Sequence, residues 1–145
     1  MSTFDQSLPM MLYRVLDDIM PAYRKLFARF GLTEQQWRVL RVVWTSDTVT
    51  SANLAERTLL SAPSLVGMID RLESKGLVER VRSRSDRRET FIVATQKGAA
   101  LQREVMPFVE EVQRGHAARL TKSQWVQLNA LLEGLCQKAD ETVEV

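Results

Sequence analysis

Arginine is concentrated in one short stretch of the sequence. Residues 80–88 hold five arginines against a single aspartate, although the whole chain carries a net charge of only +2. A guanidinium group forms paired hydrogen bonds with phosphate oxygens and fits a narrow, electronegative minor groove. The concentration therefore indicates contact with a nucleic acid, and the alternative is a solvated basic hairpin with no partner. The candidate residues are Arg82, Arg84, Asp86, Arg87 and Arg88.

The segment just before these arginines is predicted to be a short helix that ends at Gly76. Ser61 is a suitable N-cap, and Pro63 falls in the first turn, where a missing N–H has no cost. Apolar residues at helical spacing form one face, and the other face is small or polar, so that the helix can approach another surface closely. The residues that could contact that surface are Ser61, Pro63, Ser64, Val66, Gly67 and Arg71. The alternative for each of them is an exposed helix position without a role.

These two features together predict a winged helix-turn-helix. Strands are expected over 77–82 and 90–95, joined by a loop over 83–89, and we call this hairpin the wing. A shorter helix, from about residue 50 to residue 61, would precede the first helix described and complete the helix-turn-helix. In this fold a helix enters the major groove, and the wing contacts phosphates and the minor groove.

Longer amphipathic helices are predicted at both ends of the chain. The first spans about 8–30, and Pro21 should kink or split it. Thr33, Thr95 and Thr121 are suitable N-caps for the later helices. We therefore expect a mainly α fold with a small β-hairpin wing.

The terminal helices carry more apolar surface than a helix-turn-helix of about forty residues can cover. Helix-turn-helix proteins commonly pair two recognition helices about one DNA turn apart, so the economical interpretation is an intertwined homodimer. The length fits a single domain, 1–145. Within it we expect dimerisation helices at about 8–30 and 96–143, and a DNA-binding region at about 33–95.

Many residues match a known family in order and spacing. They are Leu32, Thr33, Gln36, Trp37, Val39, Leu40, Leu54, Ala55, Glu56, Arg57, Leu72, Gly76, Leu77, Val78, Arg80, Asp86, Arg87, Arg88, Thr95, Lys97 and Gly98. On these residues the chain resembles the MarR family of winged helix-turn-helix regulators. The run Leu-Thr-Glu-Gln-Gln-Trp-Arg, 32–38, resembles regulators of homoprotocatechuate and related aromatic-acid catabolism.

The resemblance implies a dimer that binds pseudo-palindromic operators in double-stranded DNA, usually as a repressor released by a small, often aromatic, molecule. It also implies that Arg84 or Arg88 enters the minor groove, with Asp86 ion-paired to a neighbouring arginine. The chain departs from the family pattern in two ways. The turn at 58–61 lacks the usual glycine, and the helix face at 61–74 offers few long polar side chains.

A second group of residues could bind a small aromatic carboxylate. An arginine framed by aromatic rings supplies a charged hydrogen-bonding fork with an apolar lid. The alternative is ordinary surface charge on amphipathic helices. The candidates, which lie near Trp44, are Tyr13, Arg14, Asp17, Trp37, Arg38 and Arg41.

Other functions receive less support from the sequence. Cys136 suggests a redox-responsive regulator, but its place in the apolar stripe of the last helix predicts a buried thiol. His116 is the single histidine, so we expect no metal and no cofactor. Catalytic constellations and phosphate loops are missing, which argues against an enzyme. An architectural or protein-contact winged helix stays open. The single cysteine and the lack of a long apolar run favour a cytoplasmic location without membrane association.

Overall fold

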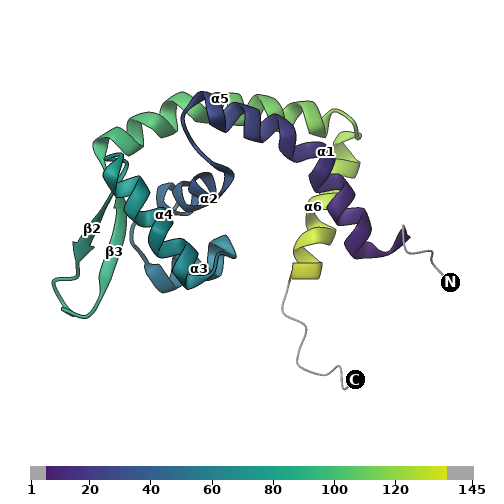
Figure 1. Ribbon diagram of the computed structural model, residues 1–145. Coiled ribbons are helices and arrows are strands. Elements are labelled where there is room, and N and C mark those ends of the chain that lie inside the picture. Colours follow the sequence, from purple (N-terminus) through teal and green to yellow (C-terminus); the bar gives the residue numbers. More distant parts are fainter. Residues whose placement is uncertain (1–5, 137–145) are drawn as a thin grey trace, which may run out of the picture. The chain divides into compact units, whose positions relative to one another are not determined.

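The computed structural model describes residues 6–136 (Figure 1). Its elements are α1 (Leu8–Arg29), α2 (Glu34–Trp44), β1 (Val49–Thr50), α3 (Ser51–Thr58), α4 (Ala62–Ser74), β2 (Val78–Arg82), β3 (Thr90–Ala94), α5 (Gln96–Ala117) and α6 (Lys122–Cys136). This confirms the predicted mainly α fold with a small β-hairpin. Part of the predicted dimerisation region, 137–143, lies outside the described residues.

The chain divides into two compact units, residues 1–109 and 110–145. The first contains α1 to α4, the sheet and the first part of α5, and the second contains the rest of α5 and α6. The predicted single domain with separate DNA-binding and dimerisation regions stays a prediction.

The predicted helix starts agree with the structure. The Thr33 hydroxyl accepts the backbone N–H of Gln36, and the Gln36 side chain accepts that of Thr33, both at 3.1 Å. Thr95 and Thr121 likewise accept backbone N–H groups of Gly98 and Gln124, at 3.1 and 3.2 Å. Each bond satisfies a helix-terminal donor that has no intrahelical partner.

Of the two outcomes predicted at Pro21, a split does not occur, because α1 is continuous from Leu8 to Arg29, and a kink stays a prediction. A proline removes one backbone N–H and crowds the carbonyl four residues earlier, which is a local cost. Packing of the later turns holds the helix, since Leu26 and Phe27 are buried and the Phe27 ring stacks on Trp37 at 4.6 Å between centroids.

The wing belongs to a three-stranded antiparallel sheet in the order β1-β3-β2. Val78 pairs with Ala94 and Arg82 with Thr90, so the hairpin register is regular. The two-residue strand β1, with Val49 opposite Ile92, was not predicted. The hairpin itself is one residue shorter at each base than predicted, because Leu77 precedes the first ladder pair and Thr95 caps α5.

The turn between α3 and α4 contains a left-handed residue that is not glycine. Helix α3 ends at Thr58 and not at the predicted residue 61, because Leu59 has φ 58° and ψ 27°. The Leu59 side chain is 84% exposed. The turn therefore places a branched side chain in the left-handed region, which glycine enters without this cost.

Replacing Leu59 by glycine is expected to raise the free energy of unfolding by about 1 kcal/mol, because glycine adopts this conformation without the Cβ clash. Urea unfolding at equal protein concentration measures the change. The matched control is Leu59→Ala, which keeps a Cβ and should bring no gain. A glycine variant no more stable than the alanine variant would show that this turn holds no strain.

Candidate nucleic-acid interface

Helix α4 separates an inner and an outer face as predicted. Leu65, Met68, Ile69 and Leu72 are buried, and they hold the helix on the core. The predicted contacts Ser61, Pro63, Ser64, Val66 and Arg71 are all exposed, and Gly67 is half-buried. The Ser61 hydroxyl accepts the Ser64 backbone N–H and donates to its hydroxyl, so these two side chains form a capped polar corner at the start of the helix.

Gly67 lies in the interior of α4, where glycine costs about 1 kcal/mol relative to alanine. A Cβ built at Gly67 would meet no atom within 4 Å, and its φ is not positive. Among residues 6–136, neither packing nor backbone conformation therefore requires glycine here. A flat spot between Ser64 and Arg71 is what close approach to another surface would need.

The loop of the wing, 83–89, is ordered by short-range hydrogen bonds. The Ser83 hydroxyl accepts the backbone N–H groups of Ser85 and Asp86, both at 3.3 Å. The Ser83 N–H donates to the Glu89 carbonyl at 3.0 Å and closes the loop. The loop therefore presents its arginines from a defined backbone.

Asp86 does not act as predicted. Its carboxylate accepts the backbone N–H of Arg88 at 2.9 Å, and none of the ion pairs among residues 6–136 includes it. An aspartate that bonds the backbone two residues later forms a local turn, which competes with pairing to a guanidinium. Asp86 thus shapes the loop and leaves its arginines free of ion pairs.

Four of the five arginines remain available, and Arg80 does not. Its guanidinium bonds the Asp70 carboxylate at 2.6 Å and also bonds Glu73, both on α4. The hydrogen bond with Asp70 raises the pKa of Arg80 above its ordinary value. In the described part of the chain, Arg82, Arg84, Arg87 and Arg88 make no ion pair and are exposed.

Arg80 therefore links the wing to α4 through two ion pairs. From the sequence alone, Arg80 counts only as part of the basic charge of residues 80–88. The spacing of Asp70 and Glu73 on one helix face was the signal that could have indicated such a tie. The ion pairs of Arg80 with Asp70 and Glu73 therefore hold the wing at a fixed distance from α4, the helix expected in the major groove.

Replacing Arg80 by methionine is expected to weaken operator binding by roughly threefold to tenfold, because the wing loses its anchor and two carboxylates lose their cation. The slope of log affinity against log salt should stay nearly unchanged, since Arg80 contacts no phosphate in this arrangement. Fluorescence anisotropy over a salt series measures both quantities. Arg80→Lys should restore part of the affinity, and a slope reduced by about one for each copy bound would instead place Arg80 on a phosphate.

The six predicted ligand residues fall into two groups. Tyr13, Arg14 and Asp17 lie on exposed turns of α1, beside a shallow hollow. Trp37, Arg38 and Arg41 lie on α2, whose Trp37 contacts Phe27. Asp17 and Phe27 are about 15 Å apart along α1, so the first group does not reach the second within one copy of the chain.

The α2 group does frame an arginine with aromatic rings. The Arg41 guanidinium lies 5.9 Å from the Trp37 ring centre and donates to the Met106 sulfur at 3.3 Å. The edge of Trp44 faces Trp37, and its buried indole N–H has no hydrogen-bond partner among the described residues. Arg38 is occupied elsewhere, because it bonds the Thr58 carbonyl at the end of α3.

The expectation of a buried thiol is wrong, because Cys136 is exposed. None of the described residues of α6 is buried. Among residues 6–136, no cluster of His, Cys, Asp and Glu could hold a metal ion. Every helix of this described part is too short or too polar to cross a membrane.

Comparison with known proteins identifies the family. A model of the MarR family matches residues 32–90. The homoprotocatechuate degradative operon repressor of Escherichia coli is 35% identical over 127 residues, which are 88% of this chain and 86% of that repressor. The chain belongs to the MarR family. This confirms the resemblance seen in the sequence, and MarR-family members are DNA-binding regulators and not enzymes.

Two further proteins are similar to this MarR-family chain. The organic hydroperoxide resistance transcriptional regulator of Bacillus subtilis is 29% identical over 139 residues, and the match covers 92% of each chain. The crystal structure of NadR in complex with 4-hydroxyphenylacetate has a TM-score of 0.80 and 29% identity, and it covers 89% of this chain and 94% of NadR. These MarR-family likenesses confirm the winged-helix fold.

Proposed function

We propose that this MarR-family chain is a homodimeric repressor of a catabolic or stress operon that binds a pseudo-palindromic operator and is released by a small aromatic acid. The observation that carries the DNA-binding part is the pairing of two exposed features. One is the face of α4 with its unrequired glycine, and the other is a wing in which Arg82, Arg84, Arg87 and Arg88 make no ion pair among residues 6–136. The relative from Escherichia coli is itself named an operon repressor.

Helix α4 would enter the major groove. Ser64 and Arg71 are the polar side chains able to reach base edges, and Ser61 is placed to touch a phosphate. Pro63, Val66 and Gly67 would allow close approach, with Val66 against a thymine methyl group. Arg82 and Arg87 would contact phosphates beside the groove, while Arg84 or Arg88 enters the minor groove.

The homodimer would form through the terminal helices. In α1, Leu8, Met11, Val15 and Leu16 are each about half exposed, and in α6 the same holds for several apolar side chains. Contiguous apolar faces of this extent on a soluble chain mark an interaction surface. A second copy of the same chain supplies matching faces and would place two α4 helices on two half-sites.

The aromatic effector would bind at Trp37 and Arg41, with the carboxylate on the guanidinium. The free indole N–H of Trp44 would gain an acceptor there. Tyr13, Arg14 and Asp17 would complete the site from the partner copy, since they cannot reach it within their own chain. The likeness to NadR, solved with 4-hydroxyphenylacetate, supports this ligand class.

Gel shift and anisotropy with DNA upstream of the chain's own gene test the proposal. A specific repressor should prefer that DNA over random duplex by roughly 10³ or more, whereas an architectural protein should not. Addition of 4-hydroxyphenylacetate should lower the affinity and quench tryptophan fluorescence, and Arg41→Met should abolish the quenching. Absence of salt-sensitive DNA binding would overturn the proposal.

A second candidate function is a redox response through Cys136, favoured by its exposed thiol and by the likeness to the hydroperoxide regulator. Peroxide should then release wild-type protein from DNA and leave the Cys136→Ser variant bound. Equal release of both would exclude it.

A further inference from the structure

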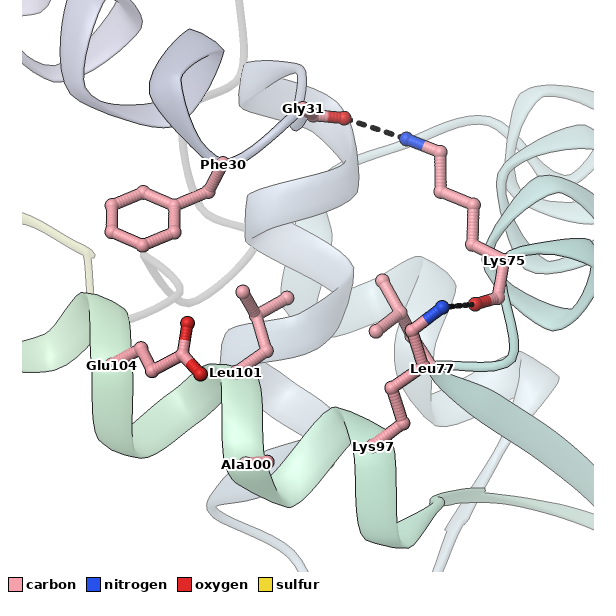
Figure 2. Close-up of a pocket in the computed structure, with 8 residues that line it drawn as sticks. All are labelled: Phe30, Gly31, Lys75, Leu77, Lys97, Ala100, Leu101 and Glu104. Carbon is pink, nitrogen blue, oxygen red and sulfur yellow. Dashed lines mark hydrogen bonds between the residues drawn. The ribbon is translucent and has the colours of Figure 1, made fainter.

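A cavity of about 380 Å³ lies where the end of α1, the end of α4 and the first turns of α5 meet (Figure 2). Its volume is near the lower end for small-molecule sites. Leu77, Ala100 and Leu101 give it an apolar floor, with the Phe30 ring at one end (Figure 2). None of the residues predicted from the sequence to bind DNA or an aromatic acid lines it.

Two lysines border one side of this cavity, and both are held by backbone carbonyls. The Lys75 ammonium donates to the Gly31 carbonyl at 2.6 Å and to the Gln36 side chain at 3.3 Å. The Lys97 ammonium donates to the Lys75 carbonyl at 2.8 Å (Figure 2). An ammonium group has three donors, so each lysine has at least one left for a ligand.

The lysine positions are fixed by the chain around them. Gly76 has φ +72°, and a Cβ there would lie 3.7 Å from the Lys97 side chain. A Cβ at Gly98 would lie only 2.1 Å from the Leu77 carbonyl oxygen, so glycine is required there for α5 to start close against the residue before β2. Gly98 thus allows the first turn of α5, which carries Lys97, to pack against the Leu77 backbone.

An acidic side chain borders the opposite side. Lys97, Leu101 and Glu104 follow at spacings of four and three, so they share one face of α5, about 10 Å from first to last. Glu104 makes no ion pair among residues 6–136. The cavity therefore has two cations at one end, an apolar middle and a carboxylate at the other end.

We propose that this cavity binds a small organic carboxylate that carries a hydroxyl or ammonium donor at its far end. The ligand carboxylate would accept hydrogen bonds from Lys75 and Lys97, which a charged acceptor makes stronger than a neutral one does. A ring would cover Leu101 against Phe30, and the distal donor would bond Glu104. This inference concerns binding alone, and it stands whether or not the proposed aromatic effector binds at Trp37.

The probe is 4-(aminomethyl)benzoate, a flat ring with a carboxylate and an ammonium group at opposite ends, titrated into the full chain by calorimetry. We expect saturable binding at this site. Removal of either end of the probe, as in 4-methylbenzoate and 4-methylbenzylamine, should weaken binding about tenfold or more. No saturable binding of the complete probe to wild-type protein overturns the proposal.

Variants locate the site. Lys97→Met should weaken binding of both carboxylate probes about tenfold, whereas Glu104→Gln should weaken 4-(aminomethyl)benzoate and spare 4-methylbenzoate. Ala100→Leu fills the cavity and keeps both lysines, so it tests the proposal even if a lysine variant unfolds. The control Lys122→Met removes an exposed lysine of α6, and Arg41→Met removes the other predicted carboxylate site. Wild-type affinity in Ala100→Leu, or loss of affinity confined to Arg41→Met, overturns the proposal.

Discussion

Replacing Arg88 by alanine is expected to weaken operator binding by about 1 to 3 kcal/mol, roughly 5- to 150-fold. Arg88 is exposed, makes no ion pair among residues 6–136, and lies in the loop 83–89, where Asp86 accepts its backbone N–H. Its side chain can therefore enter a groove or reach phosphates without first breaking an existing pair. Anisotropy titrations of operator DNA at several salt concentrations measure the loss.

The salt series also separates the two kinds of interaction that Arg88 could make with DNA. If Arg88 binds a phosphate, its removal lowers the salt slope by about one for each copy bound, about two for the dimer, and the affinity for random duplex then falls as well. If Arg88 enters the minor groove, its removal mainly reduces preference for the operator. Lys25→Ala removes an exposed cation of α1 as the control. Unchanged operator affinity of Arg88→Ala at fixed salt would contradict the assignment of the wing.

Replacing Leu131 by aspartate is expected to raise the dissociation constant of the homodimer by about 100-fold or more. Leu131 is 61% exposed in the single chain. Burial of one leucine contributes about 1.5 to 3 kcal/mol, and a two-fold interface contains each position twice. Sedimentation or light scattering over a dilution series measures the change. Operator binding should fall with it, because one copy covers only one half-site.

The matched control for this substitution is Lys122→Gln, on the same helix and also exposed. It lowers the charge by the same amount, on the opposite side of α6 from Leu131, and should leave the dimer intact. A monomeric wild-type protein at micromolar concentration would contradict the dimer itself. A dimer that tolerates Leu131→Asp would show that α6 lies outside the interface.

Local signals predicted most of the fold. Capping residues such as Thr33 and Thr95 act within three residues, so their effect can be read from the sequence alone. The strand β1 could not be predicted, because a run of two residues is too short to show the alternation of apolar and polar side chains. It forms only by pairing with β3, where Val49 lies opposite the distant residue Ile92. The continuity of α1 through Pro21 depends on packing at Phe27, which the sequence does not display.

The candidate interface was predictable where exposure follows helical period, as on α4. It was not predictable where a side chain has several possible partners. Arg80 could have paired with DNA and instead bonds Asp70, and Asp86 could have paired with an arginine and instead bonds a backbone N–H. Cys136 shows the same limit, since an apolar stripe predicts burial but does not say whether the covering surface belongs to the same chain.

The hydrogen bonds of Ser83 and Asp86 hold four like charges near one another in the wing. In the free protein these guanidinium groups repel, and the repulsion grows as salt is removed, because the screening length then increases. Contact with phosphates cancels this repulsion. The wing should therefore exchange its amide hydrogens faster in dilute buffer than in concentrated salt, and slowest of all on DNA, which makes its own mobility a reporter of the charge around it.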